Sequence, residues 1–173
     1  NYILTVMRES GRTFDNVLSE AQELGYAEAD PTFDIDGVDT AHKLALLSSV
    51  AFGSEVSFEN VYIEGIRHIT SEDINFAGEL GYRIKLLGIA KRKKEGVEQR
   101  VYPCMVPIDT AIAHVEGVFN AVVIEGDLVG SSVLQGRGAG GGPTASSVIS
   151  DIVDIARGAN FPVFAVPVGE LER

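Results

Sequence analysis

The sequence predicts an α+β (α/β) domain with a mixed, largely antiparallel sheet and helices packed on one face. Three observations lead to this fold class. Apolar residues recur at helical spacing in several segments, two pairs of strand-like segments flank short polar turns, and 45% of the 173 residues are hydrophobic. That hydrophobic content is enough for the core of one domain, so we expect a single domain over residues 1–173.

Two helices are predicted in the first third of the chain. An apolar stripe that begins after Thr13 ends at Gly25, a residue suited to the left-handed position that follows a helix. The next helix covers residues 37–52, and the side chain of Asp36 can cap its free backbone N–H groups. This helix is apolar almost all round after Lys43, so we expect it to be buried, with its charged first turns as the functional end.

A further helix and two hairpins are predicted in the middle of the chain. Thr70 and Asp73 have the spacing of a capping box, which begins a helix over residues 71–80. The strands of the two hairpins are expected at residues 83–91, 97–106, 117–125 and 128–135. Pro103 and Pro107 make the second of these strands an edge or an interrupted strand, because proline has no backbone N–H to donate.

Composition and charge exclude several classes of protein. The net charge of −11 argues against a nucleic-acid partner, which is bound by clustered Lys and Arg. No signal peptide is visible, and no apolar run approaches the ~18 residues that a membrane span needs. The single cysteine, Cys104, excludes an internal disulfide and predicts a buried, inert thiol in a reducing, cytoplasmic compartment. The first residue, Asn1, is not an initiator methionine, so we expect a piece of a longer polypeptide.

The stretch Gly25–Lys43 is an acidic loop that ends in one lysine. Its five carboxylates are those of Glu28, Asp30, Asp34, Asp36 and Asp39. Asp39 and Lys43 lie one helical turn apart on the same face. An acid and an amine held together there could meet a substrate that carries an amine and a reacting oxygen. The alternative is a solvated loop with an ordinary surface ion pair, worth only ~0.3–0.5 kcal/mol, and spacing alone leaves both open.

A second informative stretch is the glycine-rich run 136–144, GRGAGGGPT, which precedes a helix expected at about 144–157. Glycines let the backbone approach a ligand closely, and a helix start presents free N–H groups to negative charge. The run is neither a P-loop nor the dinucleotide-binding fingerprint, and a flexible strand-to-helix turn is the alternative. His42, His68 and His114 match no metal-ligand spacing, so no metal site is predicted.

Most of the chain resembles homoserine dehydrogenase, specifically its catalytic and dimerisation region. The resemblance is carried, in order, by NYILTVM, AQELGYAEADPTFDIDGVDTAHKLALLSSVAFG, DINFAGELGYRIKLLGIAK, GVFNAVVIEGD and GRGAGGGPTASSVISDIVDIARG. It implies the NAD(P)-dependent interconversion of L-homoserine and L-aspartate 4-semialdehyde in threonine, methionine and isoleucine biosynthesis. It also implies a homodimer, with NAD or NADP bound mainly by an N-terminal domain that this sequence does not include.

The resemblance also implies how the chain is organised. Residues from about 137 to 173, the glycine turn and its helix, would return toward the missing nucleotide-binding domain, and there would be no ACT regulatory domain. We therefore expect the chain alone to bind cofactor poorly and not to turn over. Two alternatives stay open: a non-enzymatic amino-acid-binding or dimerisation module, and a related amino-acid semialdehyde reductase.

The resemblance assigns roles to individual residues. Glu28 would bind the substrate ammonium with support from Asp34, and Asp39 and Lys43 would surround the oxygen that becomes carbonyl or hydroxyl. The residues expected to close against the nicotinamide side of the cofactor are Gly138, Gly140, Pro143 and Thr144. Because carboxylates surround Lys43, we expect it to be an ammonium that polarises the semialdehyde oxygen and donates a proton toward the alkoxide.

Overall fold

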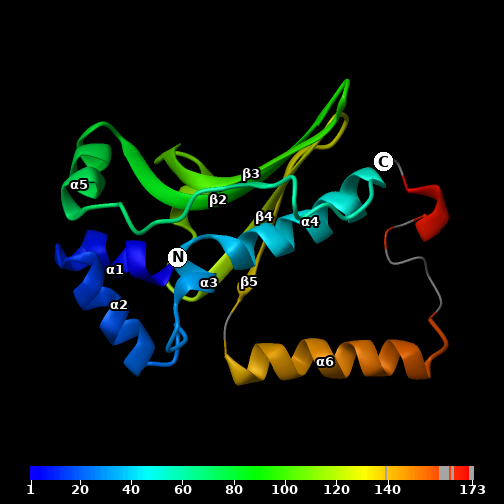
Figure 1. Cartoon of the computed structure of the whole chain (residues 1–173), viewed down its shortest axis with the longest axis horizontal. Helices are drawn as coiled ribbons and strands as arrows, with labels where there is room; N and C mark the ends of the chain where they lie inside the picture. Colours follow the sequence, from blue (N-terminus) through cyan, green and yellow to red (C-terminus); the bar gives the residue numbers. More distant parts are fainter. Residues whose placement is uncertain (139, 160–163, 165, 172–173) are drawn as a thin grey trace. The chain divides into compact units, whose positions relative to one another are not determined.

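The structure, a computed structural model, describes every residue except 139, 160–163, 165 and 172–173 (Figure 1). It divides into two units. Unit 1 comprises residues 1–29, 69–85 and 104–153, and unit 2 comprises residues 30–68, 86–103 and 154–173 apart from those just excepted. Strands β2 (Tyr82–Lys93) and β3 (Gly96–Pro107) contribute residues to both units. None of the helices in the described part of the chain combines the length and apolarity needed to cross a membrane.

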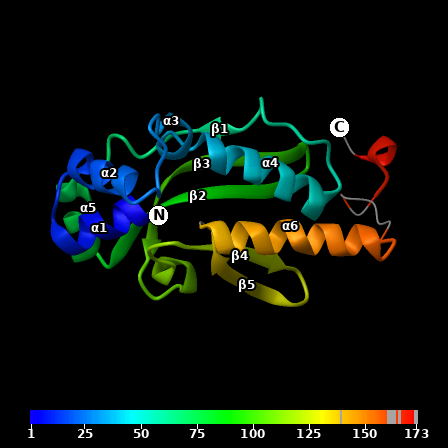
Figure 2. The ribbon, with the colours of Figure 1, turned by 90° about the horizontal axis from the view of Figure 1, so that it is seen from below.

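In unit 2, helix α4 (Val38–Phe52) packs on a small mixed sheet (Figure 2). The sheet order is β1-β3-β2, and the short strand β1 (Tyr62–Ile63) runs parallel to β3. The buried core residues of this unit are Ala41, Leu44 and Ala45 of α4 together with Val61 and Val101. Gly88 on β2 lets the helix come close, because a Cβ there would lie 3.4 Å from the side chain of Leu44.

The structure changes two predictions about unit 2. Helix α4 is not buried all round, because the side chains of Leu46, Leu47 and Val50 are exposed. One face of the helix packs on the sheet, and these three side chains do not belong to that buried cluster. Strand β3, expected to be an edge or an interrupted strand, is central in the sheet order, but its neighbour β1 pairs with only two of its residues. It accommodates Pro103 because β1 is only two residues long and pairs with β3 only at residues 100 and 101, so Pro103 lies beyond that pairing.

Unit 1 contains three packed helices, α1 (Tyr2–Ser10), α2 (Phe14–Glu23) and α5 (Ser71–Glu79), with α1 contacting the other two. Their buried residues recur at helical spacing: Leu4 and Met7, Val17 and Ala21, Ile74 and Ala77. The predicted capping box of α5 is confirmed. The hydroxyl of Thr70 accepts from the N–H of Asp73, and the carboxylate of Asp73 accepts from the N–H of Thr70 at 2.9 Å. The hydrogen bonds that the Asp73 carboxylate accepts from the N–H and the hydroxyl of Thr70 lower the pKa of Asp73.

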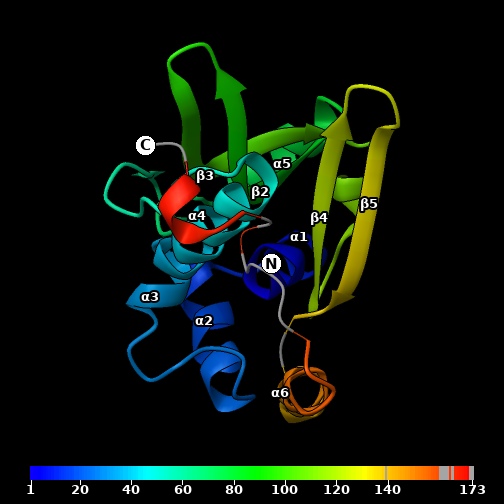
Figure 3. The same ribbon diagram turned by 90° about the vertical axis from the view of Figure 1, so that its right-hand side faces the viewer.

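The second part of unit 1 is a hairpin of β4 (Phe119–Gly126) and β5 (Gly130–Arg137), shown in Figure 3. The predicted antiparallel pairing is confirmed, with Gly126 opposite Gly130 and a three-residue turn between them. Helix α6 (Gly141–Ala156) begins three residues earlier than predicted, and none of its residues is buried. The apolar side chains of α6 and of the hairpin therefore remain on the surface of this chain.

Three short features complete the two units. Unit 2 contains the one-turn helix α3 (Thr32–Ile35) and the 3₁₀ helix η2 (Val168–Glu170). Unit 1 contains the 3₁₀ helix η1 (Ala111–His114). The thiol-bearing residue Cys104 is half-buried rather than buried, which corrects the burial predicted for it.

Lys85, on the part of β2 that belongs to unit 1, is a buried lysine with only 6% of its surface exposed. Its ammonium donates to the carbonyl of Val115 at 2.5 Å and to the side-chain oxygen of Asn1 at 3.3 Å. Burial lowers the pKa of Lys85 to about 8, because removing the ammonium from water disfavours its charged form; the charge of Glu116 opposes this shift.

The pKa of Lys85 predicts how stability changes with pH. Between about pH 8 and the ordinary lysine value of 10.5, the unfolded chain binds more protons at this residue than the folded chain does. The free energy of unfolding contributed by Lys85 should therefore rise with pH across that window, by roughly 3 kcal/mol. Urea unfolding of the 173-residue chain and of Lys85→Met, at several pH values, measures this. The free energy of unfolding of the original chain should rise with pH relative to that of Lys85→Met. The exposed-lysine variant Lys94→Met should show a constant difference, and a constant difference for Lys85→Met would contradict the prediction.

Candidate active site

Three of the four acidic and basic residues predicted to contact substrate lie in unit 2. Asp34 belongs to α3, and Asp39 and Lys43 occupy the first two turns of α4. The predicted pairing on one helix face is confirmed, since the ammonium of Lys43 binds a carboxylate oxygen of Asp39. The two side chains are 59% and 35% exposed, so their attraction contributes less than about 1 kcal/mol to stability. An amine and a carboxylate held together at this exposure are accessible to a small ligand.

Two carboxylates of the acidic loop, those of Asp30 and Asp36, are hydrogen-bonded within unit 2. Asp30 accepts a hydrogen bond from the N–H of Thr32 at 3.1 Å, at the start of α3. Hydrogen bonds from Thr32 lower the pKa of Asp30. Asp36 does not cap α4, which corrects the prediction from the sequence. The N-cap is Gly37, with φ of 84°, and Asp36 binds Arg67 instead.

Arg67 and the backbone before it were not identified from the sequence. The guanidinium of Arg67 contacts both carboxylate oxygens of Asp36, and its Nη2 also donates to the hydroxyl of Thr32 at 3.1 Å. Next to it, the N–H of Ile66 donates to the carbonyl of Ile35 at 2.8 Å. Gly65 was the available signal, because an isolated glycine in a strand-like run indicates close backbone approach. The pairing of Arg67 with Asp36 joins residues 31 positions apart, so no local sequence pattern predicts it.

His42 fastens α3 to α4 through aromatic stacking. Its ring lies parallel to that of Phe58, with centroids 3.9 Å apart, and stacks on Phe33 at 5.6 Å. His42 therefore has a packing role between these two helices. The side chain of His42 is used for packing beside Lys43, and no cluster of three or more metal-binding side chains occurs in the described residues.

Glu28 and the glycine run belong to unit 1. The backbone carbonyl of Glu28 accepts a hydrogen bond from Gln22 at 2.9 Å. In the glycine run, Gly138 donates its N–H to Val118 at 3.0 Å, and a Cβ at Gly138 would overlap the amide of Asn120. Residue 139 lies outside the described part of the chain.

The glycine run leads directly into α6. Gly140 has φ of 117°, a conformation that side chains rarely adopt, and its carbonyl accepts from the N–H and the hydroxyl of Thr144. Pro143 lies in the first turn of α6, where its missing N–H costs no hydrogen bond. The glycines of this turn leave its backbone uncovered by their own side chains at the start of a helix. The roles of Gly138, Gly140, Pro143 and Thr144 stay predictions.

Comparison with known proteins points to one family. The family model described as homoserine dehydrogenase matches residues 1–153. A homoserine dehydrogenase of Pseudomonas aeruginosa is 58% identical over 157 residues, which are 91% of this chain and 36% of that protein. A crystal structure of a homoserine dehydrogenase from Thiobacillus denitrificans is 57% identical with a TM-score of 0.87, and covers 91% of this chain and 36% of its own.

A third similar protein was solved with a cofactor. It is a hyperthermophilic archaeal homoserine dehydrogenase mutant in complex with NADPH, 34% identical with a TM-score of 0.71. The match covers 92% of this chain and 44% of that one. The chain thus spans less than half the length of each of these similar proteins.

Proposed function

Because this chain belongs to the homoserine dehydrogenase family, we propose that it is the catalytic and dimerisation portion of an enzyme that interconverts L-homoserine and L-aspartate 4-semialdehyde. The observation that carries this proposal is the exposed Asp39–Lys43 pair on the first turns of α4, inside the region that the family model matches. A cation beside a carboxylate suits a reaction in which negative charge develops on a carbonyl oxygen.

In this proposal, Lys43 acts on the reacting oxygen. When the semialdehyde is reduced, its carbonyl oxygen gains negative charge, and the ammonium of Lys43 stabilises that charge and donates the proton that gives the homoserine hydroxyl. NADH or NADPH, when bound, supplies the hydride that reaches the carbonyl carbon. Asp39 orients the ammonium through their ion pair. In the reverse direction the hydroxyl proton must leave, a step that an ammonium cannot perform alone, so a second base would share it.

Carboxylates of the acidic loop would hold the substrate's own ammonium. We assign this role to Glu28, supported by Asp34, because Asp30 and Asp36 are already hydrogen-bonded to Thr32 and Arg67. The glycine turn formed by Gly138, Gly140, Pro143 and Thr144 would close against the nicotinamide side of NAD or NADP.

The remaining surfaces support a larger assembly. A nucleotide-binding domain would cover the exposed apolar residues of α6, which fits the 36% of the Pseudomonas aeruginosa protein that this chain spans. The exposed apolar side chains of the β4–β5 hairpin, such as Ile124 and Leu134, fit a homodimer interface. We place the enzyme in the cytoplasm, where the thiol of Cys104 would stay reduced.

The experiment that tests the function is homoserine-dependent reduction of NAD⁺ and NADP⁺. It compares the 173-residue chain alone with a parent polypeptide in which, on this proposal, a nucleotide-binding domain precedes the chain. We expect turnover by the parent and none by the chain alone. If the parent instead reduces another amino-acid semialdehyde, the related reductase is the correct assignment. If the parent binds homoserine without turnover, the chain is a binding module and the proposal fails.

A further inference from the structure

The segment over residues 64–67 fastens the acidic loop to the sheet of unit 2. On one side, the N–H of Glu64 donates to the carbonyl of Val101 on β3 at 2.8 Å. On the other side, the N–H of Ile66 donates to the carbonyl of Ile35, the last residue of α3. Between them, Gly65 lies so close to Asp36 that no Cβ would fit. The end of α3 is thus tied to a strand that is itself packed under α4.

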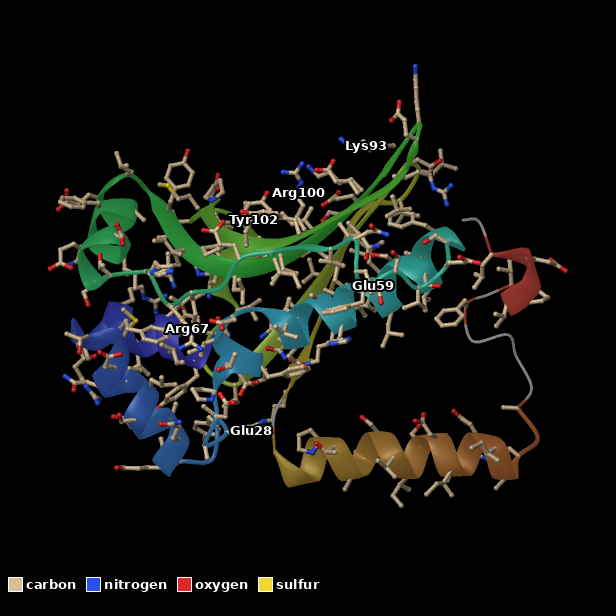
Figure 4. All side chains as sticks on the ribbon, viewed as in Figure 1. Glu28, Glu59, Arg67, Lys93, Arg100 and Tyr102 are labelled. Atoms are coloured by element: carbon tan, nitrogen blue, oxygen red, sulfur yellow. The ribbon has the colours of Figure 1, made fainter. Side chains whose placement is uncertain are left out.

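The side chain of Arg67 adds a second connection between this segment and α3. Its guanidinium contacts both oxygens of Asp36, which follows α3, and its Nη2 donates at 3.1 Å to Thr32, the first residue of α3. One planar group therefore holds both ends of a four-residue helix. Arg67 and Arg100, a second arginine of this unit, are labelled in Figure 4.

Besides the hydrogen bond from Thr32 to Asp30 and the stacking of His42 on Phe33, few contacts hold the starts of the helices that carry Asp34, Asp39 and Lys43. A helix of four residues is too short to be stable by itself, and α4 begins at Gly37 without any side-chain cap. The position of Asp34 relative to Asp39 is therefore set by what holds the residues between them. Those residues are Ile35, Asp36 and Gly37, and the first two are bound by the segment 64–67.

We propose that Arg67 is a positioning residue, which acts through Asp36 and Thr32 to hold α3 and the first turn of α4 so that Asp34, Asp39 and Lys43 keep a fixed relative placement. This inference rests on the proposed function, because it assigns Arg67 to the geometry of that site. Arg67 touches neither the substrate nor the reacting oxygen.

A positioning role differs measurably from a stabilising one. The side chains of Arg67 and Asp36 are 42% and 35% exposed, and an ion pair at this exposure adds little to global stability. By contrast, a displacement of about 1 Å at a reacting group can lower the rate roughly 100-fold. Loss of Arg67 should therefore lower kcat strongly while changing the melting temperature only slightly.

The test uses the parent polypeptide with Arg67→Ala, Arg67→Lys, Asp36→Ala and the Arg67→Ala/Asp36→Ala double variant. We expect kcat for homoserine oxidation to fall about 10- to 50-fold in Arg67→Ala, with KM raised no more than about fivefold. Arg67→Lys should restore little, since an ammonium cannot reproduce the two-pronged contact. The double variant should be no worse than either single variant, because both remove one interaction.

Arg100→Ala is the matched control. Arg100 forms an ion pair with Glu98 on β3 at comparable exposure, 54% and 34%, in the same unit. Its loss should leave kcat within about twofold of wild type. The accompanying change in melting temperature shows how much the loss of one exposed ion pair lowers stability. A kcat for Arg67→Ala within twofold of wild type would overturn the inference, as would a melting-temperature loss clearly larger than that of Arg100→Ala.

Hydrogen exchange separates failure of the inference from failure of the proposed function. In Arg67→Ala, the amides of Asp34, Asp36 and Ala41, which are hydrogen-bonded within α3 and the start of α4, should exchange faster than in wild type. Faster exchange in a parent that does not oxidise homoserine would reject the proposed function and retain the attachment by Arg67. Unchanged exchange would reject the role of Arg67, whatever the activity.

Discussion

Replacing Lys43 by alanine in the parent polypeptide should lower kcat for homoserine oxidation by about 10²- to 10⁴-fold and leave the protein folded. The proposed reaction develops negative charge on one oxygen, and the ammonium of Lys43 would be the proton donor that faces it. Because the side chain is 59% exposed and its ion pair with Asp39 contributes little to stability, the loss should appear in turnover alone. Steady-state kinetics with homoserine, beside a thermal melt, measures both quantities.

Lys93→Ala is the matched control for Lys43→Ala. Lys93 is a half-exposed lysine paired with Glu98 at 3.5 Å on the hairpin of unit 2, and its loss should leave kcat unchanged. Asp39→Asn should reproduce part of the Lys43 effect, since it removes the charge that orients the ammonium. If Lys43→Ala retains near-normal kcat in an active enzyme, the family assignment stands and the assigned roles of Lys43 and Asp39 are wrong.

Gly65→Ala should lower the free energy of unfolding of the 173-residue chain by about 3 kcal/mol. The added methyl group would lie inside the van der Waals radii of the Asp36 Cα and the Ile35 carbonyl oxygen. Both are backbone atoms, so relief requires moving α3 or the strand beside it. Urea denaturation measures the loss, and the same shift should weaken the hydrogen bond between Ile66 and Ile35.

Gly78→Ala controls for the change of glycine to alanine itself. Gly78 lies in α5, and nothing occupies the space within 4 Å of a Cβ built there. Alanine is the better helix former by about 1 kcal/mol, so this variant should be as stable as the original chain or more so. Equal stability changes for Gly65→Ala and Gly78→Ala would show that the close approach at Gly65 does not constrain the fold.

The local elements of this protein follow from its sequence because their causes are local. A capping box lies within three residues, as between Thr70 and Asp73. A hairpin is set by two alternating strands and the turn between them, as around Asp127. The pairing of Asp39 with Lys43 is likewise a consequence of helical periodicity, since residues four apart share a face.

The sequence alone does not tell which carboxylates of the acidic loop hold the fold and which remain for a ligand. Asp36 was assigned to the cap of α4, yet its partner is Arg67, and only the fold brings these two residues together. The same limit explains why α4 was expected to be buried: its pattern shows which residues are apolar, but not how much of its surface a neighbour covers.

The sequence by itself determined the family, the helix and hairpin segments and the set of charged residues near the start of α4. Each of these depends on residue identity or on spacing within a few positions along the chain. Only the tertiary structure decided that Gly65 and Arg67 hold the acidic loop, and that Asp36 is bound by Arg67. The physical reason is that these contacts join segments about 30 residues apart, where pairing depends on chain folding rather than on any local preference.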